Sequence, residues 1–243
     1  MTSTKLLYLE DFTKLEGEGS VVDVLRENDK DVVVLDQTIL YPQGGGQPYD
    51  QGMIELGDVK FKVEEVRFVD GIVKHIGVLE NGTFQKGEAV KCFIDKDRRF
   101  LNSRLHSAGH VVDMAMRQVA PEWIPAKGYH FPDGPYVEYM ATLEGKDKED
   151  LKKKLEKLCN TFIKVGREVK VAFMSTDEMK SVCHFVPDYI PKDKPSRVVM
   201  FGDFGIPCGG THVKNISEIQ SMSIRKIKAN GKDVVRVGYD ISR

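Results

Sequence analysis

The chain has 243 residues, of which 41% are hydrophobic and 30% charged, and this composition is typical of soluble globular proteins. No basic stretch is followed by an apolar run at the start, and no window approaches the ~20 apolar residues of a membrane helix, so neither a secretory signal nor a membrane span is expected. Four irregularly spaced cysteines argue against a disulfide framework, which favours a cytoplasmic protein.

The net charge of −1 hides an uneven distribution along the chain. Residues 1–92 carry 10 Lys and Arg against 17 Asp and Glu, whereas the remaining residues carry 26 against 20. A basic half beside an acidic half is typical of a protein whose basic half meets phosphate. On charge alone, a solvated basic surface is the better explanation.

Residues 1–92 predict a small β-rich domain. Short β-branched runs, such as DVVVLD at 31–36 and FKVEEVRFV at 61–69, alternate with turn signals such as Asp70-Gly71. Many short strands separated by close turns are typical of a small β-barrel or sandwich.

A glycine-rich segment, YPQGGGQPYDQG at 41–52, lies inside this region. Its three consecutive glycines expose backbone N–H groups that suit a phosphate or a carbonyl oxygen. The segment is neither a Walker loop nor a dinucleotide-binding fingerprint. Taken alone it is a hairpin connection, and the amides of Gln43 and Gln47 leave a functional role open.

Residues 93–243 predict an α+β domain. One helix is expected from a cap at Asp95 or Asp97 up to Pro121, and a second, strongly charged helix over about 148–164. Strands are predicted at 136–143, 168–174 and 198–201, and alternation around Asn230-Gly231 predicts a hairpin near the C-terminus. The expected fold class is therefore α+β, with a β-barrel-like domain at 1–92 followed by an α+β domain at 93–243.

Two pairs of potential metal ligands share one spacing. His106 and His110 lie four residues apart on the predicted helix, so their imidazoles project from one face. Cys208 and His212 repeat this separation far downstream. Three imidazoles and a thiolate form a ligand set that suits zinc, which predicts one Zn²⁺ per chain in the second domain.

The sequence pattern indicates the zinc ligands more clearly than it indicates whether the zinc is structural or catalytic. Four protein ligands are usual for a structural zinc, whereas a catalytic zinc keeps a position for water. The chain is long enough to fold without a bracing metal, and Gly209 and Gly210 allow close access by a substrate, so catalysis is favoured. Asp113 lies on the ligand face of the helix, where it either orients an imidazole or is an ordinary solvated aspartate. His130 and His184 lack the paired spacing and are left outside the predicted site.

Three motifs occur in order along nearly the whole chain: Gly-Gly-Gly-Gln-Pro-Tyr-Asp-Gln-Gly, then His-x-x-x-His, then Cys-Gly-Gly-Thr-His. In this combination the sequence resembles the freestanding alanyl-tRNA editing proteins of the AlaX type, relatives of the editing domain of alanyl-tRNA synthetase. The length is similar to that of the medium-sized form, which implies an N-terminal β-barrel before a zinc-containing editing domain. Because this family removes serine or glycine wrongly attached to alanine-specific tRNA, the resemblance implies a zinc-dependent ester hydrolase.

The resemblance also implies residue roles. The zinc ligands correspond to His106, His110, Cys208 and His212. Gln47 matches a glutamine near the editing pocket, and Thr211 lies inside the second metal motif, so both are expected to contact the serine hydroxyl or the water. Backbone N–H groups expected to bind the substrate belong to Gly44, Gly45, Gly46, Gly209 and Gly210.

The implied partner is mischarged tRNA, with no membrane, and the chain is expected to be a monomer or a homodimer. The RNA is expected along the basic half, where the cationic residues Arg225, Lys226, Lys228, Lys232 and Arg236 gather near the predicted hairpin. Three other functions fit parts of the pattern: editing of serine on threonine-specific tRNA, RNA binding by a zinc-stabilised module without catalysis, and hydrolysis of another ester or amide.

Overall fold

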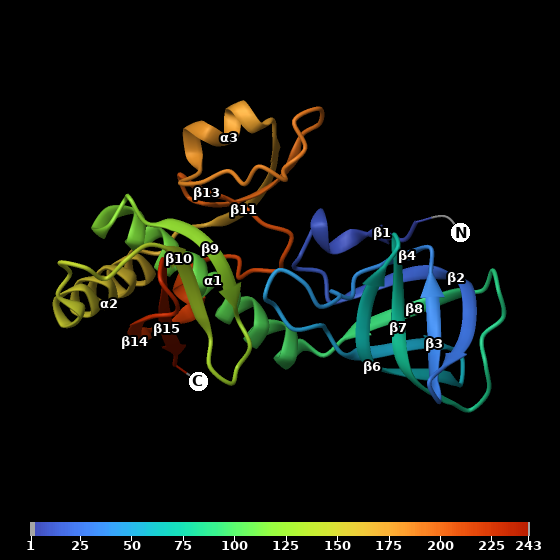
Figure 1. Ribbon diagram of the computed structural model, residues 1–243. Coiled ribbons are helices and arrows are strands. Elements are labelled where there is room, and N and C mark those ends of the chain that lie inside the picture. Colours follow the sequence, from blue (N-terminus) through green and yellow to red (C-terminus); the bar gives the residue numbers. More distant parts are fainter. Residues whose placement is uncertain (1–2, 243) are drawn as a thin grey trace. The chain divides into compact units, whose positions relative to one another are not determined.

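The computed structural model describes residues 3–242, and its architecture is α+β, as predicted (Figure 1). It divides into two compact units, Met1–Leu101 and Asn102–Arg243. Helix α1 (Lys96–Val119) begins in the first unit and continues in the second. Among the described residues, no helix combines the length and apolar character that crossing a membrane requires.

The first unit contains a closed barrel with the strand order β2-β3-β7-β6-β5-β8, in which all neighbouring strands are antiparallel. Closure leaves the barrel without the unpaired edges that promote aggregation. A short parallel pair, β1 (Lys5–Leu6) with β4 (Gln37–Thr38), and a 3-10 helix, η1 (Leu7–Leu9), accompany it. The barrel strands are β2 (Glu16–Glu27), β3 (Lys30–Leu35), β5 (Gly52–Leu56), β6 (Val59–Val69), β7 (Ile72–Glu80) and β8 (Ala89–Ile94).

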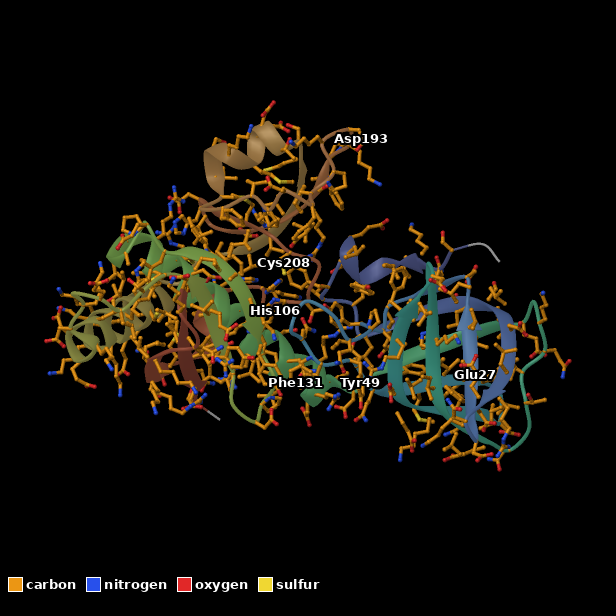
Figure 2. All side chains as sticks on the ribbon, viewed as in Figure 1. Glu27, Tyr49, His106, Phe131, Asp193 and Cys208 are labelled. Atoms are coloured by element: carbon orange, nitrogen blue, oxygen red, sulfur yellow. The ribbon has the colours of Figure 1, made fainter. Side chains whose placement is uncertain are left out.

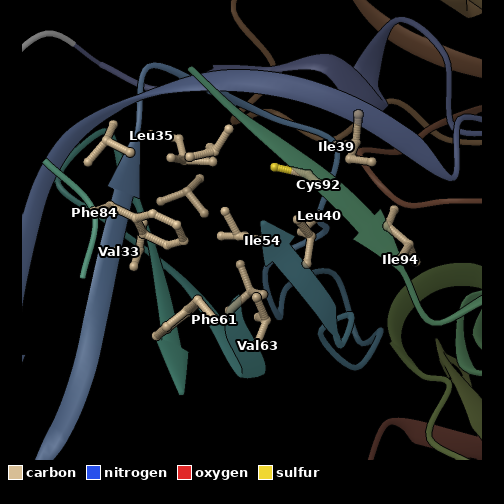
Figure 3. Packing of buried hydrophobic residues seen from close by; sticks show 14 residues of the cluster. Val33, Leu35, Ile39, Leu40, Ile54, Phe61, Val63, Phe84, Cys92 and Ile94 are labelled. Carbon is tan, nitrogen blue, oxygen red and sulfur yellow. The ribbon is translucent and has the colours of Figure 1, made fainter. Parts of the chain in front are cut away.

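Alternate residues of these strands fill the barrel interior (Figure 3). On β6 the buried positions are Phe61 and Val63 and then Val66, because a bulge between Val63 and Glu65 shifts the alternation by one residue. The barrel therefore has its own hydrophobic core, which the β-branched runs of the sequence predict.

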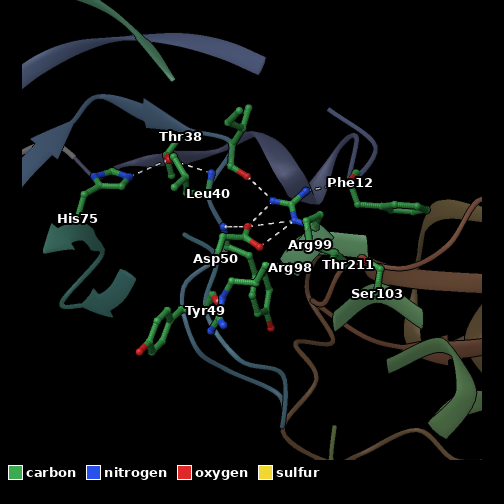
Figure 4. A network of polar contacts seen from close by, with 12 residues as sticks. Phe12, Thr38, Leu40, Tyr49, Asp50, His75, Arg98, Arg99, Ser103 and Thr211 are labelled. Carbon is green, nitrogen blue, oxygen red and sulfur yellow. Dashed lines mark hydrogen bonds and ion pairs between the residues drawn. The ribbon is translucent and has the colours of Figure 1, made fainter. Parts of the chain in front are cut away.

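One inward position of β7 is a histidine (Figure 4). His75 Nδ1 lies 2.9 Å from the Val33 carbonyl oxygen, so it carries the hydrogen, and Nε2 accepts from the Thr38 hydroxyl at 2.9 Å. The Thr38 oxygen in turn accepts the Leu40 N–H at 3.1 Å. Burial lowers the pKa of His75 to about 4, a shift that the hydrogen bond to Val33 only partly opposes. The ring is thus held neutral, with both nitrogens satisfied.

The glycine-rich segment is closed at its base by Asp50 (Figure 4). The Asp50 N–H donates to the Tyr41 carbonyl at 2.9 Å, and the Tyr41 N–H donates to Asp50 Oδ2 at 2.7 Å. Arg99, in the first turn of α1, donates through Nε to both Asp50 oxygens at 3.0 Å and through its other nitrogens to the carbonyls of Phe12 and Ile39. This ion pair is buried and fully hydrogen-bonded.

The second unit contains two antiparallel sheets, one with the strand order β14-β15-β10-β9 and one with the order β11-β12-β13. Helix α2 contacts β14, and α3 contacts β13 and β11. The elements are β9 (Ile124–Tyr129), β10 (Tyr136–Met140), α2 (Lys148–Val165), β11 (Val169–Met174), α3 (Thr176–Val182), β12 (Ser196–Phe201), β13 (Phe204–Pro207), the 3-10 helix η2 (Ile216–Ile219), β14 (Met222–Ala229) and β15 (Val234–Ile241).

The predicted helices and the hairpin of this unit are confirmed. Asp95 caps α1, since its Oδ1 accepts the Arg98 N–H at 3.0 Å, and the side chain of Asp147 caps α2. Strands β14 and β15 pair around Asn230-Gly231. Sequence reasoning did not predict α3, β9 or β13. The domain boundary at residues 92/93 stays a prediction.

Candidate metal centre

Four side chains from α1 and from the loop that follows β13 converge in the second unit. Figure 2 labels one from each segment, His106 and Cys208. The ligand atoms of His106, His110, Cys208 and His212 all lie within 4.8 Å of one another. Cys208 Sγ is 3.5 Å from His106 Nε2 and 3.4 Å from His212 Nε2. Ligand atoms of a tetrahedral zinc with N and S ligands stand about 3.4–3.6 Å apart, so these separations fit the edges of such a site.

The fold produces this convergence from two local features. Helical spacing places the two histidines of α1 one turn apart on the same side. In the loop, the Gly210 N–H donates to Cys208 Sγ at 3.3 Å, and the Val213 N–H donates to Ser107 Oγ at 3.2 Å. The loop is therefore tied to its own sulfur and to α1.

Neighbouring polar groups fix the orientation of two ligand imidazoles. His110 Nδ1 lies 3.1 Å from Asp113 Oδ2, and the Tyr139 hydroxyl donates to Asp113 Oδ1 at 2.6 Å. His212 Nδ1 lies 3.2 Å from Ser107 Oγ. Both imidazoles therefore present Nε2 to the centre of the group, and Asp113 is the orienting carboxylate that the sequence left open.

The group fits a metal ion on chemical grounds as well. Within the described residues, the buried Nε2 of His110 has no hydrogen-bond partner. A buried polar atom left this way is costly unless something satisfies it, and a bound cation does so. The donor set, three imidazole nitrogens and one sulfur, is the set that zinc prefers.

Charges within the group favour a thiolate. Burial raises the pKa of Cys208, but His110, a backbone N–H and Arg197 outweigh it, so the pKa lies below the usual value. Burial lowers the pKa of His110, yet Asp113 and Cys208 raise it to about 9. Metal binding to the neutral imidazole therefore has to displace a proton from this residue.

A fourth imidazole, which sequence reasoning left out, lies against the group. The His130 ring stacks on His106 with centroids 4.4 Å apart, and its Nδ1 is 2.7 Å from the Tyr239 hydroxyl. Two glycines make room for it: a Cβ on Gly109 of α1 or on Gly128 of β9 would overlap the ring. No spacing in the sequence pairs His130 with His106, so only the fold reveals this contact. His184 lies elsewhere, with its Nε2 2.8 Å from the Pro121 carbonyl.

The predicted catalytic and substrate-binding residues of the second unit lie beside the ligands in the chain. Thr211 is fully buried, and its Oγ1 is 2.8 Å from Ser103 Oγ on α1. Gly209, next to Cys208, is exposed, and a Cβ there would meet nothing within 4 Å. The backbone at Gly209 is thus open to a ligand, while the Thr211 hydroxyl already has a neighbour.

The corresponding residues of the first unit form a tight turn. The Gln47 N–H donates to the Gly44 carbonyl at 2.8 Å, and the Gly44 N–H donates back at 3.3 Å. Between them, Gly45 and Gly46 have φ angles of +52° and +77°, which favour glycine. Gln47 is fully buried. The roles of these residues in binding or catalysis stay predictions.

Comparison with known proteins relates the chain to alanine-specific tRNA enzymes. A profile described as "tRNA synthetases class II (A)" matches residues 3–98, and one described as "Threonyl and Alanyl tRNA synthetase second additional domain" matches residues 196–237, which include Cys208 and His212. The chain is 29% identical over 237 residues to the alanyl-tRNA editing protein AlaX-L of Pyrococcus horikoshii, which covers 96% of this chain. It is 34% identical over 206 residues to the alanine–tRNA ligase of Shewanella loihica, over 83% of this chain, and 30% identical over 244 residues to that of Methanosarcina acetivorans, over 98%.

The match spans only part of each relative. The chain corresponds to 57% of the length of the Pyrococcus protein and to 23% and 26% of the two ligases. The predicted resemblance to AlaX-type editing proteins is nevertheless confirmed, because it covers nearly the whole of this chain.

Proposed function

We propose that this relative of the AlaX-type alanyl-tRNA editing proteins is an aminoacyl-tRNA deacylase, which removes serine, glycine or both from alanine-specific tRNA. The observation that carries the proposal is the convergence of the four ligand atoms within 4.8 Å, two of them in the segment that matches the synthetase second additional domain. In the reaction, water adds to the ester carbonyl carbon and the ester C–O bond breaks. The amino acid leaves free, and the ribose oxygen of the tRNA recovers a proton.

Discrimination energetics explain why such an activity is needed. A site that accepts alanine cannot strongly exclude the smaller glycine, and an apolar pocket rejects an added hydroxyl poorly. Each such difference is typically worth only ~1–3 kcal/mol, so a second, hydrolytic selection step is required.

The four ligand residues would hold one Zn²⁺, which supplies a Lewis acid beside the ester. Asp113 and Ser107 orient the imidazoles of His110 and His212 through the hydrogen bonds described above. Cys208 contributes the thiolate, which its surroundings favour.

The backbone near Gly209 is the proposed site for the developing oxyanion. Its exposure and the open space beside it support this role, because N–H groups fixed in advance stabilise such charge effectively. As an alternative, the same role is proposed for the N–H groups of Gly45 and Gly46, because the Gly44 N–H already donates to the Gln47 carbonyl. Thr211 and Gln47 are proposed to contact the substrate hydroxyl or the water on the strength of the resemblance alone, since both side chains are fully buried.

Alanine-specific tRNA is preferred over threonine-specific tRNA as the substrate because of the relatives' names. The matching profile names both the threonyl- and the alanyl-tRNA synthetase, whereas the names of AlaX-L and of the two ligases refer to alanine alone. Parallel assays with serine attached to each tRNA separate the two.

The decisive experiment uses alanine-specific tRNA that carries serine or glycine. It measures the rate at which the amino acid is removed, together with the zinc content of the protein. Cys208→Ala is expected to lower both zinc content and turnover, the latter by a hundredfold or more. His184→Ala is the matched control, because His184 lies outside the ligand group, and it is expected to retain both. Unchanged turnover in a zinc-free Cys208→Ala protein rejects the metal mechanism, and a zinc-loaded wild-type protein that deacylates neither substrate rejects the function.

A further inference from the structure

The outer face of the four-stranded sheet in the second unit carries an ordered set of aromatic and cationic side chains. Buried residues such as Val237 and Tyr239 occupy the inner face, and the residues between them point outward. The strand register places the outward residues in two rows that each cross all four strands: Lys226, Gly238, Tyr136 and Tyr129 in one, and Lys228, Arg236, Glu138 and Lys127 in the other.

Three aromatic rings form a stack at the β9 edge of this face, which we call the aromatic ladder (Phe131, Tyr129 and Tyr136). The ring centroids of Phe131 and Tyr129 are 4.5 Å apart with an interplanar angle of 14°. Those of Tyr129 and Tyr136 are 5.2 Å apart with an angle of 16°. The Arg236 guanidinium lies over the Tyr136 ring, 3.8 Å from its centroid, and closes that end. Among residues 3–242, Tyr129 is the one ring stacked on Phe131, so the ladder ends at Phe131, which is half-buried.

The charge of this face is positive. Two of its acidic groups are paired, Glu138 with Arg236 and Asp240 with Arg225, while Asp133 accepts a hydrogen bond from the Tyr129 hydroxyl at 3.2 Å. Lys127, Lys226 and Lys228 are exposed, and within the described part of the chain they have no ion pair. Unpaired lysines on the two edge strands of a sheet that also carries stacked rings combine the two features by which proteins bind single-stranded nucleic acid: cations for phosphates and ring faces for bases.

The ladder is joined in sequence to a residue that contacts the candidate metal centre. Tyr129 and Phe131 are on the outer face, while His130 between them stacks on His106. Because β9 is an edge strand, no further strand of this sheet lies beyond the ladder at that edge. In a duplex the bases are already paired and stacked, so a single strand is the form whose bases are free to stack on Phe131.

We propose that this sheet face binds the unpaired 3′ end of the substrate RNA, with a base stacked on Phe131 and phosphates on Lys226 and Lys228. The identity of the RNA rests on the proposed deacylase function, but the stacking itself does not require catalysis. The test therefore uses RNA that carries no attached amino acid.

The probe is a short, fluorescein-labelled single-stranded RNA ending in CCA, titrated with the full chain and followed by anisotropy. Phe131→Leu keeps an apolar side chain but removes the ring, and it is expected to weaken binding by about fivefold to a hundredfold. Phe131→Trp restores a ring and is expected to restore binding. Phe173→Leu is the matched control, because Phe173 is 57% exposed on β11 of the other sheet.

The phosphate contacts have a separate readout. Lys228→Glu is expected to reduce the slope of log affinity against log salt concentration by about 0.7 for each phosphate that the side chain no longer neutralises. Lys153→Glu, at an exposed position of α2, is the control that should leave the slope unchanged.

Each outcome decides between the two proposals. If Phe131→Leu binds like the wild type, or if a blunt duplex binds as tightly as the single strand, the sheet-face proposal is rejected even when deacylation is intact. If Phe131→Leu no longer binds the RNA while the wild type deacylates no tRNA, the deacylase function fails and the RNA site stands.

Discussion

At the scale of single residues, the geometry of the candidate metal centre depends on side chains outside its four candidate ligands. Asp113 is one of them, since it links His110 to the Tyr139 hydroxyl. Its charge strengthens the hydrogen bond from the His110 N–H, and this orientation makes Nε2 a better ligand.

Asp113→Asn is expected to weaken zinc affinity by about 10- to 100-fold, because the amide keeps the shape but loses the charge. Competition with a chromophoric chelator measures the affinity directly. Asp188→Asn, at an exposed loop position, is the control. Equal affinities for the wild type and Asp113→Asn would show that the hydrogen bond does not tune the ligand.

Gly109 tests the importance of the stacked imidazole. Gly109→Ala improves helix propensity by about 1 kcal/mol, but its Cβ overlaps the His130 ring, which must then move off His106. We expect weaker metal binding and an altered absorption spectrum of the cobalt-substituted protein. His130→Ala removes the stacked ring without crowding the helix, so full metal affinity in that variant would mean that loss of the stack is not the cause.

At the scale of elements, the first turn of α1 holds the glycine-rich segment through the buried Arg99–Asp50 pair. Arg99→Met is expected to cost about 3–5 kcal/mol of unfolding free energy, because it leaves Asp50 buried without its partner. Denaturant titration measures this. Arg98→Met is the neighbouring control, since Arg98 is only half-buried and donates to the single carbonyl of Tyr49. A cost for Arg99→Met no greater than for Arg98→Met would contradict the expectation.

His75, on strand β7, makes the stability of the folded barrel depend on pH. Its pKa is about 4 in the folded barrel against an ordinary value near 6.5, so the unfolded chain takes up the proton first as pH falls. The stability contributed by neutral His75 is therefore complete above pH 6.5 and is lost between about 6.5 and 4, a loss of about 3 kcal/mol. His75→Gln does not titrate and should show a correspondingly smaller loss in unfolding measurements over this range. Parallel pH curves for the two proteins would contradict the assignment.

Sequence patterns predict the elements that follow simple periodicity. Helices α1 and α2 and the hairpin around Asn230-Gly231 are in this class. Strand β9 escaped prediction because Pro125 and Gly128 interrupt its pattern, although an edge strand tolerates both. Helix α3 has only seven residues, but the capping box of Ser175 and Glu178 was a usable signal.

In the candidate metal centre, too, some features follow a local sequence pattern and others do not. The four converging side chains could be picked out because each pair is local in sequence and shares one spacing. The contact of His130 with His106 and that of Ser107 with His212 join distant segments, so they depend on tertiary packing that no local pattern encodes.

At the scale of the whole molecule, each unit has features that hold it together without a metal. The barrel has a closed sheet and its own core, and the second unit has two sheets and buried residues on α1 and α2. Folding that depended entirely on zinc would be unusual for a chain of this size.

Chelation is therefore expected to leave the far-ultraviolet circular dichroism nearly unchanged while lowering the melting temperature. At zinc concentrations 100- to 1,000-fold above Kd, binding stabilises the folded state by about 3–4 kcal/mol, which corresponds to a shift of roughly 5–15 °C. Restoring zinc should restore the melting temperature. Loss of secondary structure on chelation would instead favour a zinc-stabilised RNA-binding module.

Strand β9 imposes a constraint on how this sequence can diverge. Because neighbouring side chains of a strand point to opposite faces, inserting or deleting one residue before Tyr129 would exchange the two sides. The imidazole would then face solvent, and an aromatic ring would be directed at the ligand histidines. Insertions and deletions should therefore be excluded from residues 124–131 in working descendants of this chain, whereas the connection at 141–147 has no such restriction.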